Sequence, residues 1–260
     1  VSFNLNHSFE KIQGPYIIVS HKNKKKKIKT DILIGADGAN SKVRNLINKK
    51  RTSSAIGMQA LINYKNKKNT YKVFLGKRYG TFAWIVPESK NRARAGILTK
   101  DQKKFKNFLN EINAKPIKYI SGTIPLYKNL NICKNNIFLV GDAALTIKNT
   151  TSGGIVYGLK SAKSLTEAIN KKKDYKKIFN KKIRKSLILH NLIYKTMNYL
   201  TDKEYNKIIL YCRKKRVKRI IEKSDREYPL RMMIKILVVQ PLFLLLLPKI
   251  LLRVIIKKIL

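Results

Sequence analysis

Two segments of the sequence combine an apolar strand with a turn of glycine and aspartate, a pairing suited to binding a nucleotide cofactor. They are Ile32–Arg44 (ILIGADGANSKVR) and Ile137–Ala144 (IFLVGDAA). Glycines let the backbone approach phosphates and sugar hydroxyls closely. A carboxylate at the carboxyl end of a strand can accept hydrogen bonds from ribose or ribityl hydroxyls. The candidate cofactor-binding residues in these turns are Asp37, Gly38, Gly141 and Asp142.

A third segment places a helix amino terminus a short distance beyond the second turn. The residues 152–155 (SGGI) open a helix that we expect over 152–169. A helix amino terminus offers unpaired N–H groups and the positive end of its dipole to a pyrophosphate. One Asp-Gly turn after a strand is usually an ordinary turn, but the three features in this order indicate a flavin-binding fold. Further candidate cofactor-binding residues are therefore Gly153, Gly154 and Ile155.

The two turns resemble the Asp-Gly motif and the Gly-Asp motif of the FAD-dependent hydroxylase and reductase superfamily. This resemblance implies that FAD is the cofactor and that Asp142 binds its ribityl or ribose side. Gly154 and Ile155 would place backbone N–H groups beside the pyrophosphate and the flavin ring. Asp37 and Gly38 would shape the turn beneath the cofactor.

A further segment points to one subfamily. Phe82–Pro87 (FAWIVP) is similar to the Tyr-x-Trp-x-Phe-Pro signature of geranylgeranyl reductases, and a strand ending in Gly96 follows it, as in that family. The resemblance implies that this sheet faces a prenyl chain, with Phe82, Trp84 and Pro87 as substrate-binding residues. An aromatic wall can bury an alkenyl chain without requiring hydrogen bonds. The alternative is that Trp84 is an ordinary core tryptophan.

The sequence also departs from the family pattern. Leu145 stands where the family has glycine, Asn149 where it has proline, and Ser152 where it has the first of three glycines. A branched side chain where backbone should approach the cofactor would weaken binding. The Gly-x-Gly-x-x-Gly unit of ~30 residues that holds the adenosine diphosphate half of FAD is not found. We therefore expect either a fragment or a split gene whose partner polypeptide supplies that unit.

Hydrophobic patterning predicts the elements that position these residues. Short strands are expected at 16–19, 31–34, 119–126 and 137–140, with a hairpin loop over 21–27. An antiparallel sheet is expected from strands at 56–64, 70–75, 81–86 and 94–98. Helices are expected from a cap at Ser41 to Ile47, over 101–112 with Phe105, Phe108, Leu109 and Ile112 on one face, and as one or two basic amphipathic helices within 174–223.

These elements predict a mixed α/β (α+β) fold. It would comprise a Rossmann-type, hydroxylase-like FAD-binding core without its N-terminal βαβ unit, an antiparallel substrate-binding sheet and a C-terminal helical region. The expected boundaries are 1–50 and 131–172 for the FAD-binding domain, 51–130 for the substrate domain, and 173–260 for the helices with a membrane-associating tail.

The charge of the chain is strongly unbalanced, with 58 Lys and Arg against 14 Asp and Glu, a formal net charge of +44. A nucleic-acid binder, a protein on an anionic membrane surface and the coding bias of an AT-rich genome would all produce this excess. The lysines are spread along the chain and no nucleic-acid-binding motif occurs. We therefore expect no specific nucleic-acid partner, and retain the membrane surface and the coding bias.

The tail of the chain favours a membrane. Residues 236–247 form an uncharged apolar run, shorter than the ~20 residues of a spanning helix, and 250–260 is amphipathic and basic. Such a segment suits the membrane interface, although it could also dock on the protein's own core. We expect a cytoplasmic protein, peripheral on the membrane. Cys133 and Cys212 form no CxxC, so reduced thiols and no metal site are expected.

The functional hypothesis is the saturation of isolated prenyl double bonds in an isoprenoid lipid, such as an archaeal-type geranylgeranyl glycerophospholipid or a related diphosphate. The residues nominate no proton donor. Two alternatives remain open. One is an aromatic-ring monooxygenase on the same fold, and the other is a degenerate, non-catalytic subunit that binds a membrane or a partner.

Overall fold

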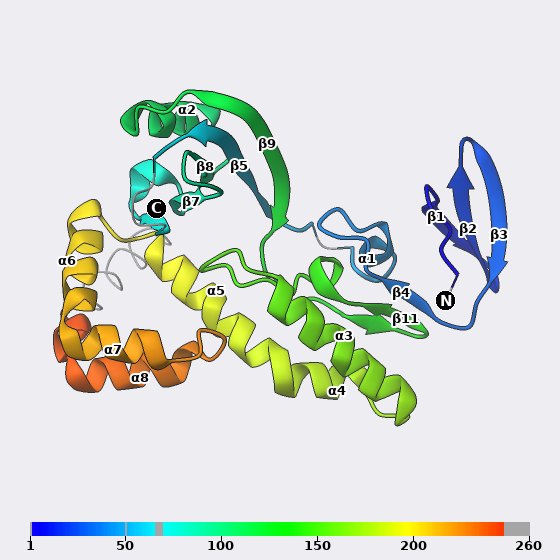
Figure 1. The fold of residues 1–260 in the computed structure, drawn as a ribbon. Helices are drawn as coiled ribbons and strands as arrows, with labels where there is room; N and C mark the ends of the chain where they lie inside the picture. Colours follow the sequence, from blue (N-terminus) through cyan, green and yellow to red (C-terminus); the bar gives the residue numbers. More distant parts are fainter. Residues whose placement is uncertain (1, 50, 66–69, 247–260) are drawn as a thin grey trace, which may run out of the picture. The chain divides into compact units, whose positions relative to one another are not determined.

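The computed structural model describes residues 2–49, 51–65 and 70–246. Contacts divide the chain into two units, residues 1–53 with 125–188 and residues 54–124 with 189–260 (Figure 1). Both units are therefore discontinuous in sequence. We call them the first and the second unit and describe each by itself.

The first unit is built on a small sheet of β4 (Leu33–Gly35), β11 (Ile137–Leu139) and β10 (Cys133–Lys134), in the order β10-β11-β4. β11 runs parallel to β4, with Leu139 opposite Gly35, and antiparallel to β10. The strands at 31–34 and 137–140 are thus confirmed. Because β4 and β11 are parallel, the turns that follow them leave the sheet at the same edge.

Helices carry the chain away from these turns. α1 (Lys42–Ile47) begins as expected at Ser41, whose hydroxyl accepts a hydrogen bond from the Arg44 amide at 2.8 Å. α3 (Ile155–Asn170), α4 (Tyr175–Phe179) and α5 (Lys185–Met197) follow the second turn. The Tyr175 hydroxyl donates to the Leu139 carbonyl at 2.8 Å and so fastens α4 to the end of β11.

A separate antiparallel sheet in the first unit has the order β1 (Ser8–Gln13), β2 (Tyr16–His21) and β3 (Lys24–Lys29). The hairpin loop expected over 21–27 is wrong. The turn is only Lys22-Asn23, both left-handed with φ of 45° and 64°, as a two-residue hairpin requires. β3 was missed because its lysines show no alternation: residues 24–27 are all exposed, at the open edge of the sheet.

The second unit contains a five-stranded sheet in the order β6-β7-β8-β5-β9. Its strands are β5 (Ser54–Asn63), β6 (Lys72–Phe74), β7 (Ala83–Pro87), β8 (Arg92–Leu98) and β9 (Pro116–Pro125). The expected antiparallel sheet is confirmed, and its pairings are β6 with β7, β7 with β8 and β8 with β5.

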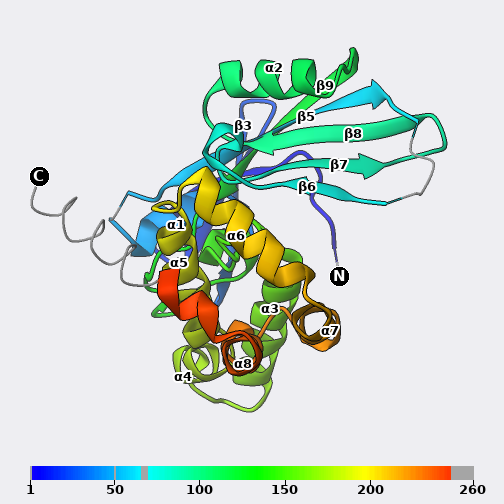
Figure 2. The ribbon, with the colours of Figure 1, turned by 90° about the vertical axis from the view of Figure 1, so that its left-hand side faces the viewer.

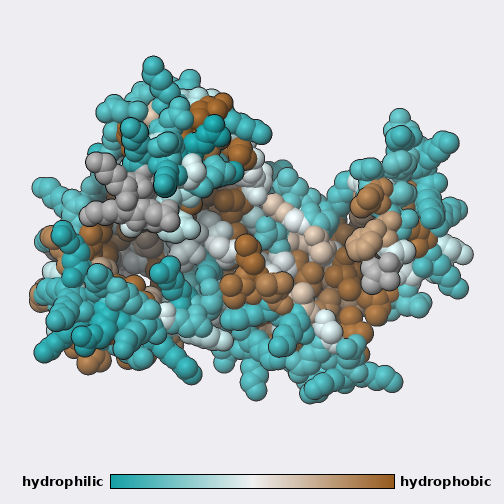
Figure 3. All heavy atoms as spheres, viewed as in Figure 1, coloured by the Kyte–Doolittle hydropathy of each residue, from teal (hydrophilic) through white to brown (hydrophobic). Residues whose placement is uncertain are grey.

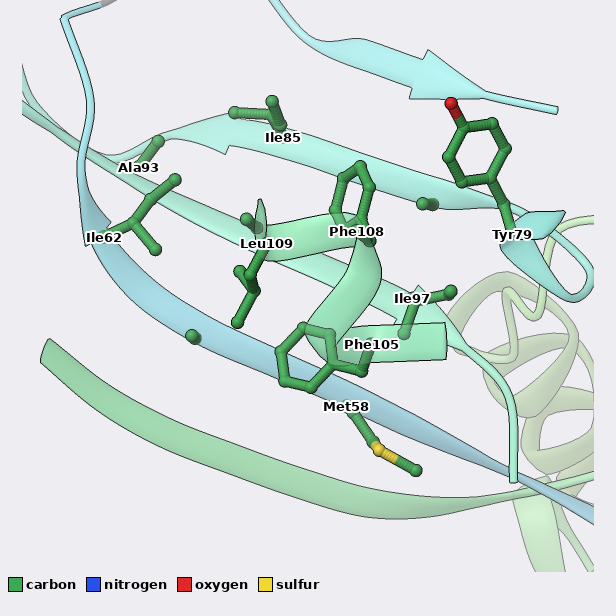
Figure 4. Packing of buried hydrophobic residues seen from close by; sticks show 12 residues of the cluster. Met58, Ile62, Tyr79, Ile85, Ala93, Ile97, Phe105, Phe108 and Leu109 are labelled. Atoms are coloured by element: carbon green, nitrogen blue, oxygen red, sulfur yellow. The ribbon is translucent and has the colours of Figure 1, made fainter. Parts of the chain in front are cut away.

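α2 (Gln102–Glu111) covers one face of this sheet (Figure 2). Phe105, Phe108 and Leu109 are buried, and Figure 4 shows them against strand residues such as Ile62 and Ile97. This aliphatic and aromatic contact is the main hydrophobic core of the second unit, and it confirms the helix expected over 101–112.

The C-terminal region contains more helices than expected. The stretch 174–223 holds α4, α5, α6 (Asp202–Arg213) and α7 (Lys215–Lys223), rather than one or two helices. A π-helical segment (Asn180–Arg184) joins α4 to α5. Thr201, which forms a capping box with Glu204, starts α6, and the non-helical backbone at Lys214 separates α6 from α7.

The apolar run that begins at Ile236 is divided as well. α8 (Pro229–Val239) stops before Pro241, which cannot continue a helix, and a 3₁₀ segment (Pro241–Leu246) follows. Among the described helices, none has the length and apolar character needed to cross a membrane. The amphipathic segment expected over 250–260 lies outside the described residues.

Trp84 lies on the sheet face opposite α2, because its neighbours Ala83 and Ile85 are buried in the α2 core and side chains alternate along a strand. Its cross-strand partner is Gly96. A Cβ at Gly96 would lie 2.3 Å from Trp84 Cζ2, so the indole ring rests directly on the β8 backbone. This explains why a glycine follows the aromatic segment.

Gly96→Ala should displace the Trp84 ring and destabilise the protein by about 1–3 kcal/mol through overpacking. Trp84 is the only tryptophan, so its fluorescence emission reports the displacement directly. Gly122→Ala in β9 is the matched control, because a Cβ there meets nothing within 4 Å. Equal melting temperatures and emission maxima for the two variants would contradict this packing.

Candidate functional site

The Asp-Gly and Gly-Asp turns lie side by side at the carboxyl edge of the parallel strands. The Val140 amide donates to the Gly35 carbonyl at 3.0 Å, so the strands remain paired up to the turns. Gly38 and Gly141 both have left-handed backbone, with φ of 75° and 59°, and open space where a side chain would be. The structure therefore brings the two sequence motifs together in one place.

Arg44 joins the two turns. Its side chain is buried, and Nη2 donates to the Ala39 carbonyl in the first turn at 2.6 Å. Nη1 donates to the carbonyls of Asp142 and Ala143 in the second turn, at 3.3 Å each. Burial lowers the pKa of the Arg44 guanidinium and the charge of Asp37 opposes this effect; an arginine in a protein nevertheless stays protonated.

Asp37 serves the local structure. Its carboxylate accepts hydrogen bonds from the Ser41 hydroxyl and from the Val43 amide, the latter at 3.2 Å. It therefore holds the amino-terminal end of α1 against the first turn. This placement fits the expectation that Asp37 and Gly38 shape the turn, while leaving Asp37 little capacity for a ligand.

Asp142 has the opposite character. It is half-buried, and within the described residues its carboxylate has no hydrogen-bond partner. Burial raises the pKa of the Asp142 carboxyl. A Cβ built on Gly154 would lie 2.9 Å from Asp142 Oδ1, so this carboxylate adjoins the glycines before α3. A partly desolvated acceptor without a protein partner is well suited to receive hydroxyl hydrogen bonds from a ligand.

The amino terminus of α3 completes the site. No side chain caps the helix at Gly154, so its first N–H groups have no side-chain acceptor there. Ile155 is 82% exposed. The Gly141 amide donates to Ser161 Oγ at 3.0 Å, which fixes α3 to the second turn. Gly153, Gly154 and Ile155 thus lie on the helix start that adjoins Asp142, an arrangement that fits an anionic group.

The residues that depart from the family pattern have structural explanations. Leu145 and Ser152 are both left-handed, with φ of 54° and 55°, a conformation that normally favours glycine. The Leu145 side chain is fully buried, so it packs into the core instead of lining an open site. Asn149 is buried and accepts from the Tyr127 amide at 2.7 Å.

The substrate-binding candidates lie in the second unit. Trp84 and Pro87 belong to β7 and Phe82 immediately precedes it. All three are partly buried, and the rings of Phe82 and Trp84 have centroids 5.5 Å apart. Phe82 and Trp84 form an aromatic surface on the sheet face that α2 leaves uncovered. Pro87 pairs with buried Ala93 and so lies on the face that α2 covers.

Sequence reasoning missed two residues that hold the site, Arg44 and Ser161. Arg44 ends the first motif segment, and its position after a capped helix start was the available signal. Ser161 offered no such signal, because a serine within a helix usually hydrogen-bonds to the backbone of its own helix. It also does so here, by donating to the Gly158 carbonyl.

A cavity of about 230 Å³ lies elsewhere in the first unit. Its lining includes Tyr16, Asp31, Asn135 and Ile137, at the amino end of β4 and β11. The candidate site lies at the carboxyl end of these strands. The cavity is therefore a different feature, and no nominated site residue lines it.

Comparison with solved structures establishes the class of fold. A geranylgeranyl bacteriochlorophyll reductase-like protein of Thermoplasma acidophilum superposes with a TM-score of 0.71 over 95% of this chain and 68% of that one, at 19% identity. The flavin-dependent halogenase CmlS superposes with a TM-score of 0.57 over 82% of this chain and 48% of that one, at 14% identity. The expected fold, that of the FAD-dependent oxidoreductases, is confirmed.

Sequence relatives then narrow the resemblance. Geranylgeranyl diphosphate reductase of Synechocystis is 31% identical over 55% of this chain and 39% of its own length. Digeranylgeranylglycerophospholipid reductase of Methanosarcina acetivorans is 27% identical over 56% and 40%. An uncharacterized protein of Methanocaldococcus jannaschii is 27% identical over 75% and 58%. The chain is thus a homologue of geranylgeranyl reductases that spans only part of their length. No family model matches it.

Ser152→Gly should stabilise the cofactor-free protein by about 1–2 kcal/mol. Glycine removes the left-handed strain of a residue with a side chain, and it removes a buried hydroxyl that has no hydrogen-bond partner in the described part of the chain. Ser152→Ala is the control, because it removes the hydroxyl but keeps the strain. A melting temperature for Ser152→Gly no higher than that of Ser152→Ala would contradict a role for strain.

Asp142→Asn should also stabilise the cofactor-free protein at neutral pH, by about 0.5–1 kcal/mol, since the carboxylate is only half-buried. The raised pKa means that folding disfavours the ionised form. The gain should therefore shrink as the pH falls through the raised pKa towards the ordinary value of ~3.9. Denaturant unfolding across this pH range measures it, and a gain independent of pH would exclude the charge as its cause.

Proposed function

We propose that this chain forms the flavin-facing and substrate-facing parts of an FAD-dependent reductase that saturates double bonds of prenyl chains. One observation carries the proposal. Two strand-end turns, held together by Arg44, place an unpartnered carboxylate, that of Asp142, beside the amino terminus of α3. Hydroxyl-binding and phosphate-binding groups lie next to each other there, as a nucleotide cofactor requires.

Each part of the site has a task in this proposal. Asp142 would accept hydrogen bonds from ribityl or ribose hydroxyls, and the amino terminus of α3 at Gly153, Gly154 and Ile155 would bind the pyrophosphate. When bound and reduced, FAD would supply the hydride that adds to one carbon of the double bond. The chain's own residues bind and orient the reactants and exclude water from them.

The substrate would be an isoprenoid lipid. The names of two relatives specify geranylgeranyl diphosphate and digeranylgeranylglycerophospholipid, and Phe82 and Trp84 offer an aromatic surface to such a chain. A flavin-dependent monooxygenase remains the second candidate, because the same fold carries other flavin chemistry, as in the halogenase. The homologous reductases favour the first. Because the substrate is a lipid, the enzyme would work at a membrane as a peripheral protein.

The adenosine diphosphate half of FAD would be held by residues outside this sequence, in a longer polypeptide or in a separate one. β4 supports this part of the proposal. It lies at the edge of its sheet, and Ile34 within it and Ile32 just before it are 46% and 40% exposed. Parallel strands are normally buried on both sides, so a further strand carrying the Gly-x-Gly-x-x-Gly unit would fit beside β4.

Asp142→Ala should reduce flavin retention about 10- to 100-fold in the complex with that unit, as expected for the loss of a charge-assisted hydrogen-bond acceptor. The visible spectrum of the purified complex measures bound flavin. Asp31→Ala is the control, because Asp31 lies at the other end of β4. Unchanged flavin content in Asp142→Ala would reject its role. The reaction itself is tested by mass spectrometry, which detects two added hydrogens for each saturated bond.

A further inference from the structure

α8 is apolar on nearly all sides. Leu230, Ile234 and Val238 follow one another at four-residue spacing and are 56%, 53% and 77% exposed. The opposite side of α8 carries Met232, Ile236 and Val239, which are partly buried. A helix that is hydrophobic all round is normally covered all round. In the described structure α7 packs against α8 (Figures 1 and 2) but leaves the row of Leu230, Ile234 and Val238 open.

Cations lie along one flank of this apolar row. Arg231 and Lys235 follow on the adjacent flank of α8, and both are exposed. Across residues 213–235 there are ten Lys or Arg and three Asp or Glu. α7 buries Val217 and directs its basic residues outward. In Figure 3 hydrophilic side chains cover the part of the molecule around α7, with hydrophobic ones at its margin near α8.

The helix pair is fastened in place. Lys214, before α7, donates to Gln240 Oε1, after α8, at 2.9 Å. Phe243, just beyond α8, stacks edge-on against Tyr211 of α6, with centroids 5.2 Å apart. Both contacts hold the carboxyl end of α8 to neighbouring helices. The apolar row is thus presented on a supported helix.

We propose that this face of α8, comprising Leu230, Ile234 and Val238 with Arg231 and Lys235, docks on an anionic lipid bilayer. An apolar row sinks into the acyl boundary while flanking cations meet the headgroup phosphates. Tyr228, 47% exposed just before the helix, suits the same boundary. α8 has only 11 residues (Pro229–Val239), too few to span a bilayer. It would therefore lie along the bilayer surface. Its charge complements anionic lipid.

This inference rests on the proposed function only in its expectation of a lipid substrate. Membrane docking needs no flavin, so the two proposals can fail separately. The face overlaps the tail that sequence analysis nominated only at Val238, which belongs to the apolar run 236–247. Its other residues precede that run.

Co-sedimentation of the full chain with vesicles tests the docking face. The vesicles contain phosphatidylcholine with or without phosphatidylglycerol. The paired substitution Ile234→Ser with Val238→Ser keeps the charge and should reduce binding to anionic vesicles about tenfold or more. The matched control is Ile188→Ser with Leu192→Ser on α5, a pair at the same spacing that is 47% and 59% exposed. Circular dichroism verifies that each variant is folded.

A second arm tests the charges. Arg231→Gln with Lys235→Gln should weaken binding to anionic vesicles roughly fivefold for each cation removed, with little change on neutral vesicles. The proposal is overturned if the Ile234 and Val238 pair binds like the unaltered chain, since the remaining cations would then carry all binding. It is equally overturned if the unaltered chain binds neither type of vesicle. The partner of this face would then be an acidic protein.

Discussion

The buried guanidinium of Arg44 is the contact on which the candidate site depends. The sheet of the first unit has only three residues in each parallel strand, so strand pairing by itself defines the turns beyond it weakly. Arg44 donates to one turn through Nη2 and to the other through Nη1. A planar, always-charged donor fork is suited to hold several carbonyls at fixed relative positions. Asp142 is presented to solvent on a framework that this side chain holds.

Several features of the same loop are unfavourable for an isolated protein. Leu145 and Ser152 occupy left-handed backbone without being glycine, and Asp142 is desolvated without a partner. Such features tend to gather at functional sites, where the surrounding structure holds them in place. Two buried residues offset part of this destabilisation. Leu145 fills the core, and Asn149 accepts a hydrogen bond from the Tyr127 amide. The loop therefore holds left-handed backbone at two positions where glycine would adopt it without strain.

Much of this arrangement could be predicted from the sequence, and the reason lies in local chemistry. The Ser41 cap, the α2 stripe and the alternating strands of the second unit are set by neighbours in sequence, and all appear as expected. β3 was not predicted because its consecutive lysines show no alternation of polar and apolar residues. The break between α5 and α6 was not predicted because it depends on the Thr201 cap, whereas the composition of this region is similar throughout. Arg44 and Ser161 escaped because their partners are 98 and 20 residues away, and spacing does not show such contacts.

The lysine-rich strand β3 has a consequence for how the protein behaves at high concentration. An open strand edge is a template on which a second copy can add its own strand, and lysines on that edge oppose this because two such edges repel. Residues 24–27 are consecutive lysines on the outer edge of their sheet. Repulsion between exposed charges is screened over ~3 Å at about 1 M salt. Ionic strength should therefore govern whether this edge resists self-association, with dilute buffer the protective condition.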